Sequence, residues 1–314
     1  MKTKRNSFLK VILAIVLIPV ALFVLVIGGL NIAKFAIYSD YYAIKSDLCT
    51  NPGLNDGFVC QGIFAHEKSE KIFVSGYMKD HSASRVYVTD MNNNSYYVSL
   101  YKDNTEFTGH AGGIAYYGET VYIASEDTVY TVDINKFLNG KNGDNIDIGA
   151  GVAVNNAADF IYADSDYIYV GEFHDGENYI TDHEYVTPNG TNYAIISRYL
   201  PSDLTKPNKI YSVGNKVQGI CFTPDGKLVT STSYGLTDSE YFVYDLNDAT
   251  DSGNTLDGAS VYYLGECIKT FKGPAMVEGL DYYNGKVITL TESASNKYIF
   301  GKFFFATKIV SLDI

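Results

Sequence analysis

The sequence predicts an all-β fold that is built from a repeated unit and preceded by one transmembrane helix. Three observations lead to this prediction. Short runs of alternating apolar and polar residues fill the chain, which contains 28 tyrosines. A two-stranded unit recurs along it, and an uncharged apolar run lies near the N-terminus. Alternating runs rich in aromatic and β-branched residues are typical of strands rather than helices.

The repeated unit is a β-hairpin that begins with small residues. Two copies have the turns Asp225-Gly226 and Asn284-Gly285, which strongly favour tight hairpins. Equivalent positions near the starts of the copies are 61, 112, 158, 218 and 278, a spacing typical of repeat folds. Their sequences are CQGIFAHEKSEKIFVSGY (60–77), HAGGIAYYGETVYIASE (110–126), AADFIYADSDYIYVGEF (157–173), VQGICFTPDGKLVTSTS (217–233) and VEGLDYYNGKVITLTES (277–293).

Further alternating runs follow the hairpins, so that a complete unit has four strands. Four-stranded units repeated around an axis are typical of a β-propeller. Five units predict a single five-bladed propeller, and six blades is the alternative if residues 174–216 hide an irregular blade. The last unit has room for only three strands. We expect residues 41–48 to supply its fourth, which closes the ring without a free sheet edge.

The apolar run covers residues 11–30 and contains no charged residue. At about 1.5 Å per residue it spans roughly the 30 Å hydrocarbon core of a bilayer. Lys2, Lys4, Arg5 and Lys10 precede it, which places the N-terminus on the cytoplasmic side. The run is longer than the apolar region of a cleaved signal peptide. We therefore expect a cytoplasmic tail at 1–10, an uncleaved single-pass anchor in the cell membrane at 11–34 and an extracytoplasmic propeller domain at 35–314.

Composition limits the partners of that domain. The chain has 24 basic and 36 acidic residues, of which five basic residues and one acidic residue lie before position 41, so the remainder carries 19 against 35, a net charge of −16. Such a surface repels nucleic acid, which we exclude as a partner. Cys49 and Cys60 both lie on the expected oxidising side of the membrane and are candidates for one disulfide.

The hairpins resemble the broad group of NHL, YVTN and SMP-30-like propellers, through a Gly-Ile or Gly-Leu start, a turn and a second strand beginning with Val, Ile or Leu. Gln218-Gly219-Ile220 with Ser233-Tyr234-Gly235 also resembles the propeller-type glutaminyl cyclases, and Gln61-Gly62-Ile63 with Ser75-Gly76-Tyr77 resembles them more weakly. Thr232 and Ser75 stand where that family places an acidic residue. The first resemblance implies cation-assisted lactonase or esterase chemistry, and the second implies a transferase that cyclises N-terminal glutamine.

In a propeller, the first strand of each blade begins at the face of the ring where the second strand ends. The repeat therefore predicts one group of side chains around the channel mouth. The strand starts contribute Gln61, His110, Asp159, Gln218 and Glu278, and the ends of the second strands contribute Tyr77, Glu126, Glu172, His174, Ser233 and Glu292. Two long segments, 174–191 and 293–308, leave the same face, and the second brings Phe300 and Phe303 as expected apolar walls of a ligand pocket.

These residues fit two kinds of function. The first is a ligand-binding or sensing module that uses the mouth for a small molecule, a peptide or an extracellular protein. The second is an enzyme, with Glu278, Asp159, His110 and His174 as candidate catalytic residues. In the cation-assisted form, Ca²⁺ is the expected cofactor and Asp159, Glu172, Glu278 and Glu292 are the expected ligands. The chain lacks the G-x-S-x-G, P-loop and H-E-x-x-H motifs, so the binding module is preferred and the enzyme remains the alternative.

Overall fold

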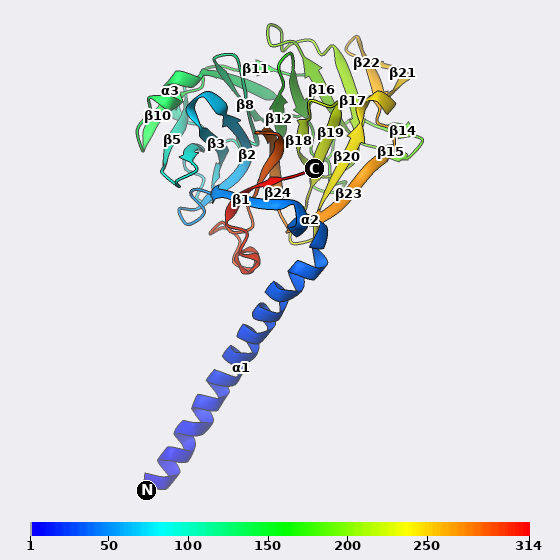
Figure 1. Ribbon diagram of the computed structural model, residues 1–314. Coiled ribbons are helices and arrows are strands. Elements are labelled where there is room, and N and C mark those ends of the chain that lie inside the picture. Colours follow the sequence, from blue (N-terminus) through cyan, green and yellow to red (C-terminus); the bar gives the residue numbers. More distant parts are fainter. Residues whose placement is uncertain (1) are drawn as a thin grey trace.

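The computed structural model describes the backbone of residues 2–314 and the side chains of residues 13–314. A long helix projects from a ring of β-sheets (Figure 1). The ring is a five-bladed β-propeller, as the hairpin repeat predicts. The predicted cytoplasmic tail at 1–10 lies outside the residues whose side chains are described.

Each blade is a twisted sheet whose strands follow one another outward from the channel. The first blade contains β2 (Phe58–His66), β3 (Lys71–Met78), β4 (Arg85–Asp90) and β5 (Ser95–Lys102), with β6 (Thr105–Glu106) and β10 (Asp144–Asp147) added at its edge. The second contains β7 (Gly113–Tyr117), β8 (Thr120–Ser125), β9 (Thr128–Asp133) and β11 (Val152–Ala153). The third contains β12 (Phe160–Ala163), β13 (Ile168–Gly171), β16 (Ala194–Tyr199), β17 (Lys209–Val213), β22 (Ala259–Tyr263) and β21 (Thr250–Leu256).

The remaining two blades complete the ring. The fourth contains β18 (Val217–Phe222), β19 (Lys227–Thr232), β20 (Ser239–Asp245) and β23 (Cys267–Gly273), and the fifth contains β24 (Val277–Tyr283), β25 (Lys286–Thr291), β26 (Lys308–Leu312) and β1 (Lys45–Thr50). Outside the blades lie α1 (Lys2–Ile37), α2 (Ser39–Ile44), α3 (Ile134–Leu138), the short 3₁₀ turns η1 (Glu67–Ser69), η2 (Leu246–Asp248) and η3 (Gly301–Phe304), and the hairpin β14 (Tyr185–Thr187) with β15 (Gly190–Asn192). The six-bladed alternative is wrong, because β16 and β17 join the third blade.

The N-terminal segment closes the ring. Strand β1 pairs antiparallel with β26, so the fifth blade draws on both ends of the chain. The expected extended segment at 41–48 is only partly correct, because residues 39–44 form α2. The helical turn directs the buried Tyr41 ring against the Tyr241 ring, with 6.2 Å between centroids. Residues 246–256, between the fourth blade's β20 and the strand β22, form η2 and β21 at the edge of the third blade.

Glycines let the innermost strands approach one another closely. A Cβ atom on Gly279 would lie 3.0 Å from Gln61 O, and one on Gly219 would lie 2.7 Å from Gly279 Cα. Glycine inside a strand often marks such close backbone approach. The glycines that open the hairpin units therefore allow five first strands to meet around a narrow channel.

Helix α1 contains an apolar segment, Leu13–Ile37, with mean hydropathy 3.0. None of its most apolar stretch is buried against the rest of the protein. Its length and composition suit either a membrane span or a signal sequence. Tyr38 follows it directly, so almost no linker separates this segment from the propeller.

Candidate functional site

A cavity of about 600 Å³ opens at the channel mouth, where the first strands begin and the second strands end. Side chains from all five blades line it, as the repeat predicts. The predicted residues in its wall are Gln61, Tyr77, His110, Glu126, Asp159, Gln218, Ser233, Glu278 and Glu292, and loops add Tyr179, Tyr234, Lys297 and Tyr298.

Three of the lining residues sit at β-bulges. The pairing register shifts between Cys60 and Ile63, between Val217 and Gly219, and between Val277 and Leu280. Each shift leaves one polar residue beside a glycine at the channel: Gln61, Gln218 and Glu278. A bulge leaves one residue unpaired in the strand ladder and redirects its side chain. The short pattern Gln/Glu-Gly-Ile/Leu is the sequence signal for these wall residues.

The most unusual feature of the cavity is a pair of buried glutamates. Glu278 lies in the first strand of the fifth blade and Glu292 follows its second strand, and their exposed fractions are 3% and 8%. Burial raises the pKa of both carboxyl groups above the ordinary range. The negative charge of Glu292 raises the pKa of Glu278 further. The pair therefore holds protons that exposed glutamates lose well below neutral pH.

Hydrogen bonds position Glu292 at this site. Gln61 Nε2 donates to Glu292 Oε2 at 2.9 Å, and a hydrogen bond with Tyr298 lowers the Glu292 pKa against the effect of burial. Lys297 also lowers the pKa of both glutamates by its charge. Its Nζ donates to Tyr77 OH and lies 4.5 Å from the centroid of that ring. Lys297 is exposed, so its charge sits at the rim and offsets little of the burial cost inside.

Asp159 and His110 occupy other parts of the wall. Burial raises the pKa of Asp159 to about 6, although its Oδ2 accepts a hydrogen bond from Phe173 N at 2.7 Å. The His110 ring packs edge-on against Tyr77 with 4.5 Å between centroids. Burial, with the nearby charge of Lys297, lowers the pKa of His110, so its imidazole is neutral at neutral pH.

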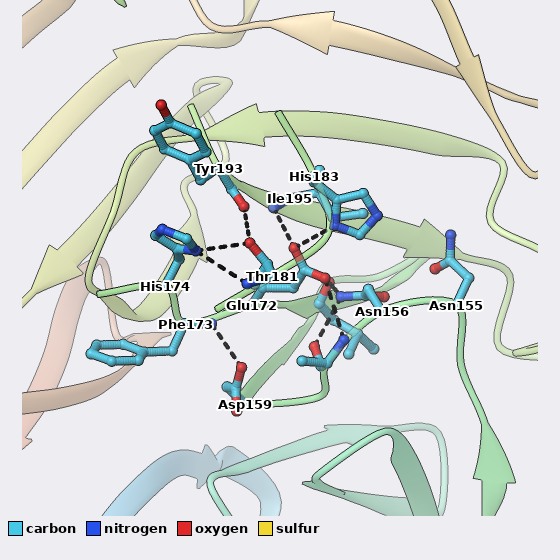
Figure 2. Close-up of polar contacts among 12 residues, drawn as sticks. Asn155, Asn156, Asp159, Glu172, Phe173, His174, Thr181, His183, Tyr193 and Ile195 are labelled. Carbon is cyan, nitrogen blue, oxygen red and sulfur yellow. Dashed lines mark hydrogen bonds and ion pairs between the residues drawn. The ribbon is translucent and has the colours of Figure 1, made fainter. Parts of the chain in front are cut away.

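Two predicted mouth residues are structural instead. Glu172 accepts hydrogen bonds from Ile195 N at 3.0 Å and Ala157 N at 3.4 Å, and His183 Nδ1 lies 2.9 Å from its Oε2 (Figure 2). These bonds direct Glu172 into the base of the 174–193 loop, and the bond to Glu172 raises the pKa of His183. Neither Glu172 nor His174 lines the cavity, so the predicted position of both at the channel mouth is wrong, and the ligand, metal and catalytic roles expected for them stay predictions.

His174 secures the same loop. Its Nδ1 accepts a hydrogen bond from Thr181 N at 3.2 Å, and its ring stacks on Tyr193 at 5.1 Å between centroids (Figure 2). No local sequence pattern predicts these contacts, because the partners come from an irregular loop whose path depends on the packed blade.

The predicted aromatic wall is also displaced. Phe300 and Phe303 do not line the cavity. Phe303 packs against α1, where its ring centroid lies 5.3 Å from that of Phe23, and Phe300 is 69% exposed. The same loop does reach the cavity, but through Lys297 and Tyr298. Those two residues were missed because they precede the phenylalanine cluster that identified the loop.

The expected calcium ligands do not assemble as a set. Glu172 points away, and the described part of the chain contains no group of three or more His, Cys, Asp or Glu side chains arranged to hold a metal ion. The candidate disulfide is not formed either, since Cys49 and Cys60 are free thiols. Cys60 Sγ instead accepts from Asn51 Nδ2 at 3.1 Å, which satisfies it in the core.

Fold and cavity together define a class: a five-bladed propeller with an apolar N-terminal helix and an acidic, tyrosine-lined mouth. No model of a known protein family and no curated protein matches the sequence.

Solved structures with a similar fold include three enzymes. The PQQ-bound aldose sugar dehydrogenase of Streptomyces coelicolor is 15% identical over 79% of this chain and 77% of its own, with a TM-score of 0.44. The glutaminyl cyclase of Myxococcus xanthus is 8% identical over 78% of this chain and 90% of its own, with a TM-score of 0.42. The chain spans 55% of the hydrazine synthase chain of Kuenenia stuttgartiensis, which is 12% identical over 74% of this chain with a TM-score of 0.41. These likenesses concern the fold alone.

Proposed function

We propose that this protein is a membrane-anchored, extracytoplasmic propeller whose mouth binds a small ligand that carries a protonated amine. The observation that carries the proposal is the buried pair Glu278 and Glu292. Two carboxyl groups held out of water without an adjacent buried cation are costly to ionise. An ammonium group between or beside them would supply a positive charge and offset the free-energy cost of ionising the two carboxyl groups.

The rest of the cavity wall suits the same ligand. Tyrosine rings attract an ammonium group through their π-faces, and Tyr77, Tyr234 and Tyr298 all line the mouth. Gln61 and Gln218 supply amide groups, and Lys297 supplies a cation at the rim. We infer that the ligand presents an amine toward the glutamates and an acceptor oxygen toward the rim, as an amino acid or a peptide N-terminus does.

The position in the cell forms part of the proposal. The basic residues at 2–10 favour a cytoplasmic N-terminus, and the anchor at 11–34 then places the domain at 35–314 outside. An acidic domain at the external face of the membrane meets cationic small molecules and peptide ends without competition from nucleic acid.

The test is thermal unfolding of the full chain in nanodiscs with ethanolamine, and with ethylene glycol as a matched neutral control. A ligand present at 100 times its Kd stabilises the folded state by about 2.7 kcal/mol. We expect ethanolamine to raise Tm and ethylene glycol to leave it unchanged, and Glu278→Gln to remove most of the ethanolamine effect. Equal responses to the two probes, or an undiminished response in Glu278→Gln, would overturn the proposal.

Calcium is tested in the same assay. The displaced Glu172 leaves Asp159, Glu278 and Glu292 as the expected ligands in the cavity. A Tm increase with Ca²⁺ that a chelator reverses and that Asp159→Asn abolishes would replace the amine with a metal ion as the ligand. Absence of that response supports the amine.

Acid–base catalysis is the second candidate function, and the raised pKa of Glu292 favours it. Burial raises that pKa to about 7, so the carboxyl group can donate a proton near neutral pH. In cyclisation of an N-terminal glutamine, the α-amine forms a C–N bond with the side-chain amide carbon, the bond to the amide nitrogen breaks, and ammonia leaves with the proton that the acid supplies. The proton that the α-amine loses returns to the acid. The assay is ammonia release from a glutaminyl peptide, with a lactone as the hydrolase probe. We expect loss of turnover in Glu292→Gln, and no turnover of either probe by the wild type would leave binding alone.

A further inference from the structure

The mouth lies on the face of the propeller from which α1 leaves. Tyr38 follows the apolar segment directly, and its OH donates to Asp238 Oδ1 at 2.8 Å. Asp238 follows the loop whose Tyr234 lines the cavity. In Figure 1, the loop before β26 projects to the same side of the ring as α1, whereas β21 and β22 lie at the opposite side. Helix and mouth therefore share one face.

The loop before β26 runs along α1 itself. Asn31 Nδ2 donates to Phe303 O at 2.8 Å, and Lys34 Nζ donates to Phe304 O at 2.9 Å. The Phe303 ring reaches Phe23, seven residues inside the uncharged run that ends at residue 30. At 1.5 Å per residue this is a depth of about 10 Å along the helix. If the run lies in a bilayer, the loop tip lies in the same leaflet.

Exposed apolar side chains gather on this face. Outside α1, ten large apolar side chains of the described chain are exposed, and seven of them lie on three loops that border the mouth. They are Tyr179 and Ile180, Tyr234 and Leu236, and Ile299, Phe300 and Phe305. Ile180 is 64% exposed and Ile299 is 72% exposed, values that are unfavourable for loop tips in water.

We propose that these three loops dock the mouth face onto the outer leaflet of the membrane that α1 crosses, so that the cavity opens against the lipid surface. The inference rests on the proposed anchor and names where the ligand comes from: the leaflet surface rather than bulk solution. Apolar and aromatic side chains that enter the interface by about 5–10 Å are a known way to hold a protein on a bilayer. Lys297 and Lys302 flank Ile299 and Phe300, where ammonium groups meet the headgroups.

Charge limits the kind of contact that the domain can make with a bilayer. The net charge of −16 after residue 40 disfavours broad contact with anionic headgroups. Lysines flank only the tip at Ile299 and Phe300, whereas Glu177 and Asp182 flank Ile180, so docking through the three loops depends on their apolar side chains. The anchor raises the effective concentration of the loops at the membrane. Because α1 ends next to Tyr38, the loops stay beside the bilayer and do not have to bind it from solution.

The test uses the full chain in nanodiscs, with Cys267→Ser to remove the exposed thiol; the other three cysteines are buried. Single cysteines at Phe300 and Ile180 receive an environment-sensitive fluorophore, and Asn254→Cys, in β21 on the opposite side, serves as the matched control. Lipids with a quencher on the acyl chain report contact. We expect a blue shift and strong quenching at positions 300 and 180 and neither at 254.

The outcomes separate the two proposals. Labels at 300 and 180 that behave like the label at 254, in a chain that stays in the nanodisc, would overturn the docking and leave the anchor intact. A chain cleaved after α1 and released from the disc would overturn the anchor and the docking together. The variant Ile180→Ser/Leu236→Ser/Phe300→Ser leaves the glutamates untouched. We expect it to keep the Tm response to soluble ethanolamine, so that response depends only on the proposed amine site.

Discussion

The third and fifth blades contain the same residue at the same position of the repeat and use it differently. Glu172 directly follows β13 and Glu292 directly follows β25, and both are buried. The backbone N–H of each bonds to a nearby carbonyl, Ile195 O at 3.1 Å or Met276 O at 3.0 Å. Glu172 then meets two further N–H donors and a histidine, whereas Glu292 meets Gln61 and a second glutamate in an open cavity.

The comparison shows that a position in the repeat does not fix a role. A buried carboxyl group that accepts several hydrogen bonds and has a histidine partner uses its oxygens within the protein and helps to hold the fold together. A buried carboxyl group beside a second one has fewer such partners, and it remains available to a proton or to a ligand cation. Removing the carboxyl group of Glu172 should therefore lower the free energy of unfolding, whereas removing the carboxyl groups of Glu278 and Glu292 should raise it.

The largest expected effect is at Glu172. Replacement by alanine leaves Ile195 N–H and His183 without their acceptor inside the protein, and we expect a loss of about 3–5 kcal/mol in unfolding free energy. Denaturant unfolding measures it. Glu172→Gln, which retains an acceptor oxygen, should lose clearly less. If Glu172→Ala leaves the unfolding free energy almost unchanged, Glu172 does not stabilise the third blade and the contrast with Glu292 fails.

The second effect has the opposite sign and depends on pH. The Glu278→Gln/Glu292→Gln double variant removes groups whose folded-state pKa is raised. In the wild type their stability contribution is complete below about pH 4.5, and it falls as pH rises through about 7, the folded-state pKa of Glu292. We expect the double variant to exceed the wild type by about 3 kcal/mol at about pH 8, and to match it at about pH 4.

Thermal or denaturant unfolding across this pH range checks the second prediction. The matched control is Ser233→Ala, which changes a wall residue of the same cavity without a titratable group. A double variant less stable than the wild type at about pH 8 would show that the glutamates stabilise the fold, as Glu172 does.

The smallest expected effect is at the rim. Lys297→Met removes the exposed cation near the glutamates, and screening by water and salt limits its influence. We expect amine affinity to rise only a few-fold at low salt and the difference to shrink at high salt. Titration with ethanolamine at two ionic strengths measures this. A large fall in affinity would instead show that the contact of Lys297 with the acceptor oxygen of the ligand outweighs its repulsion of the amine.

Much of the fold follows from local patterns. The Asp225-Gly226 and Asn284-Gly285 turns and their flanking alternation define hairpins within a few residues of chain. The strand-start residues Gln61, Gln218 and Glu278 were predicted at the mouth and lie there, because every first strand begins at the same face. Residues 39–44 form α2 rather than a strand because Tyr41 finds an aromatic partner in another blade, which no local pattern encodes.

Local sequence patterns specify the apolar helix, the number of hairpin units and the strand starts that surround the channel, since each depends on neighbours in the chain. Tertiary structure decided which carboxyl groups face the cavity. Glu292 depends on Gln61, 231 residues away, and Glu172 depends on an irregular loop that folds only against its blade. The folded ring also brings the mouth, the loop before β26 and the end of α1 to one face, because the ring closes by pairing β1 with β26.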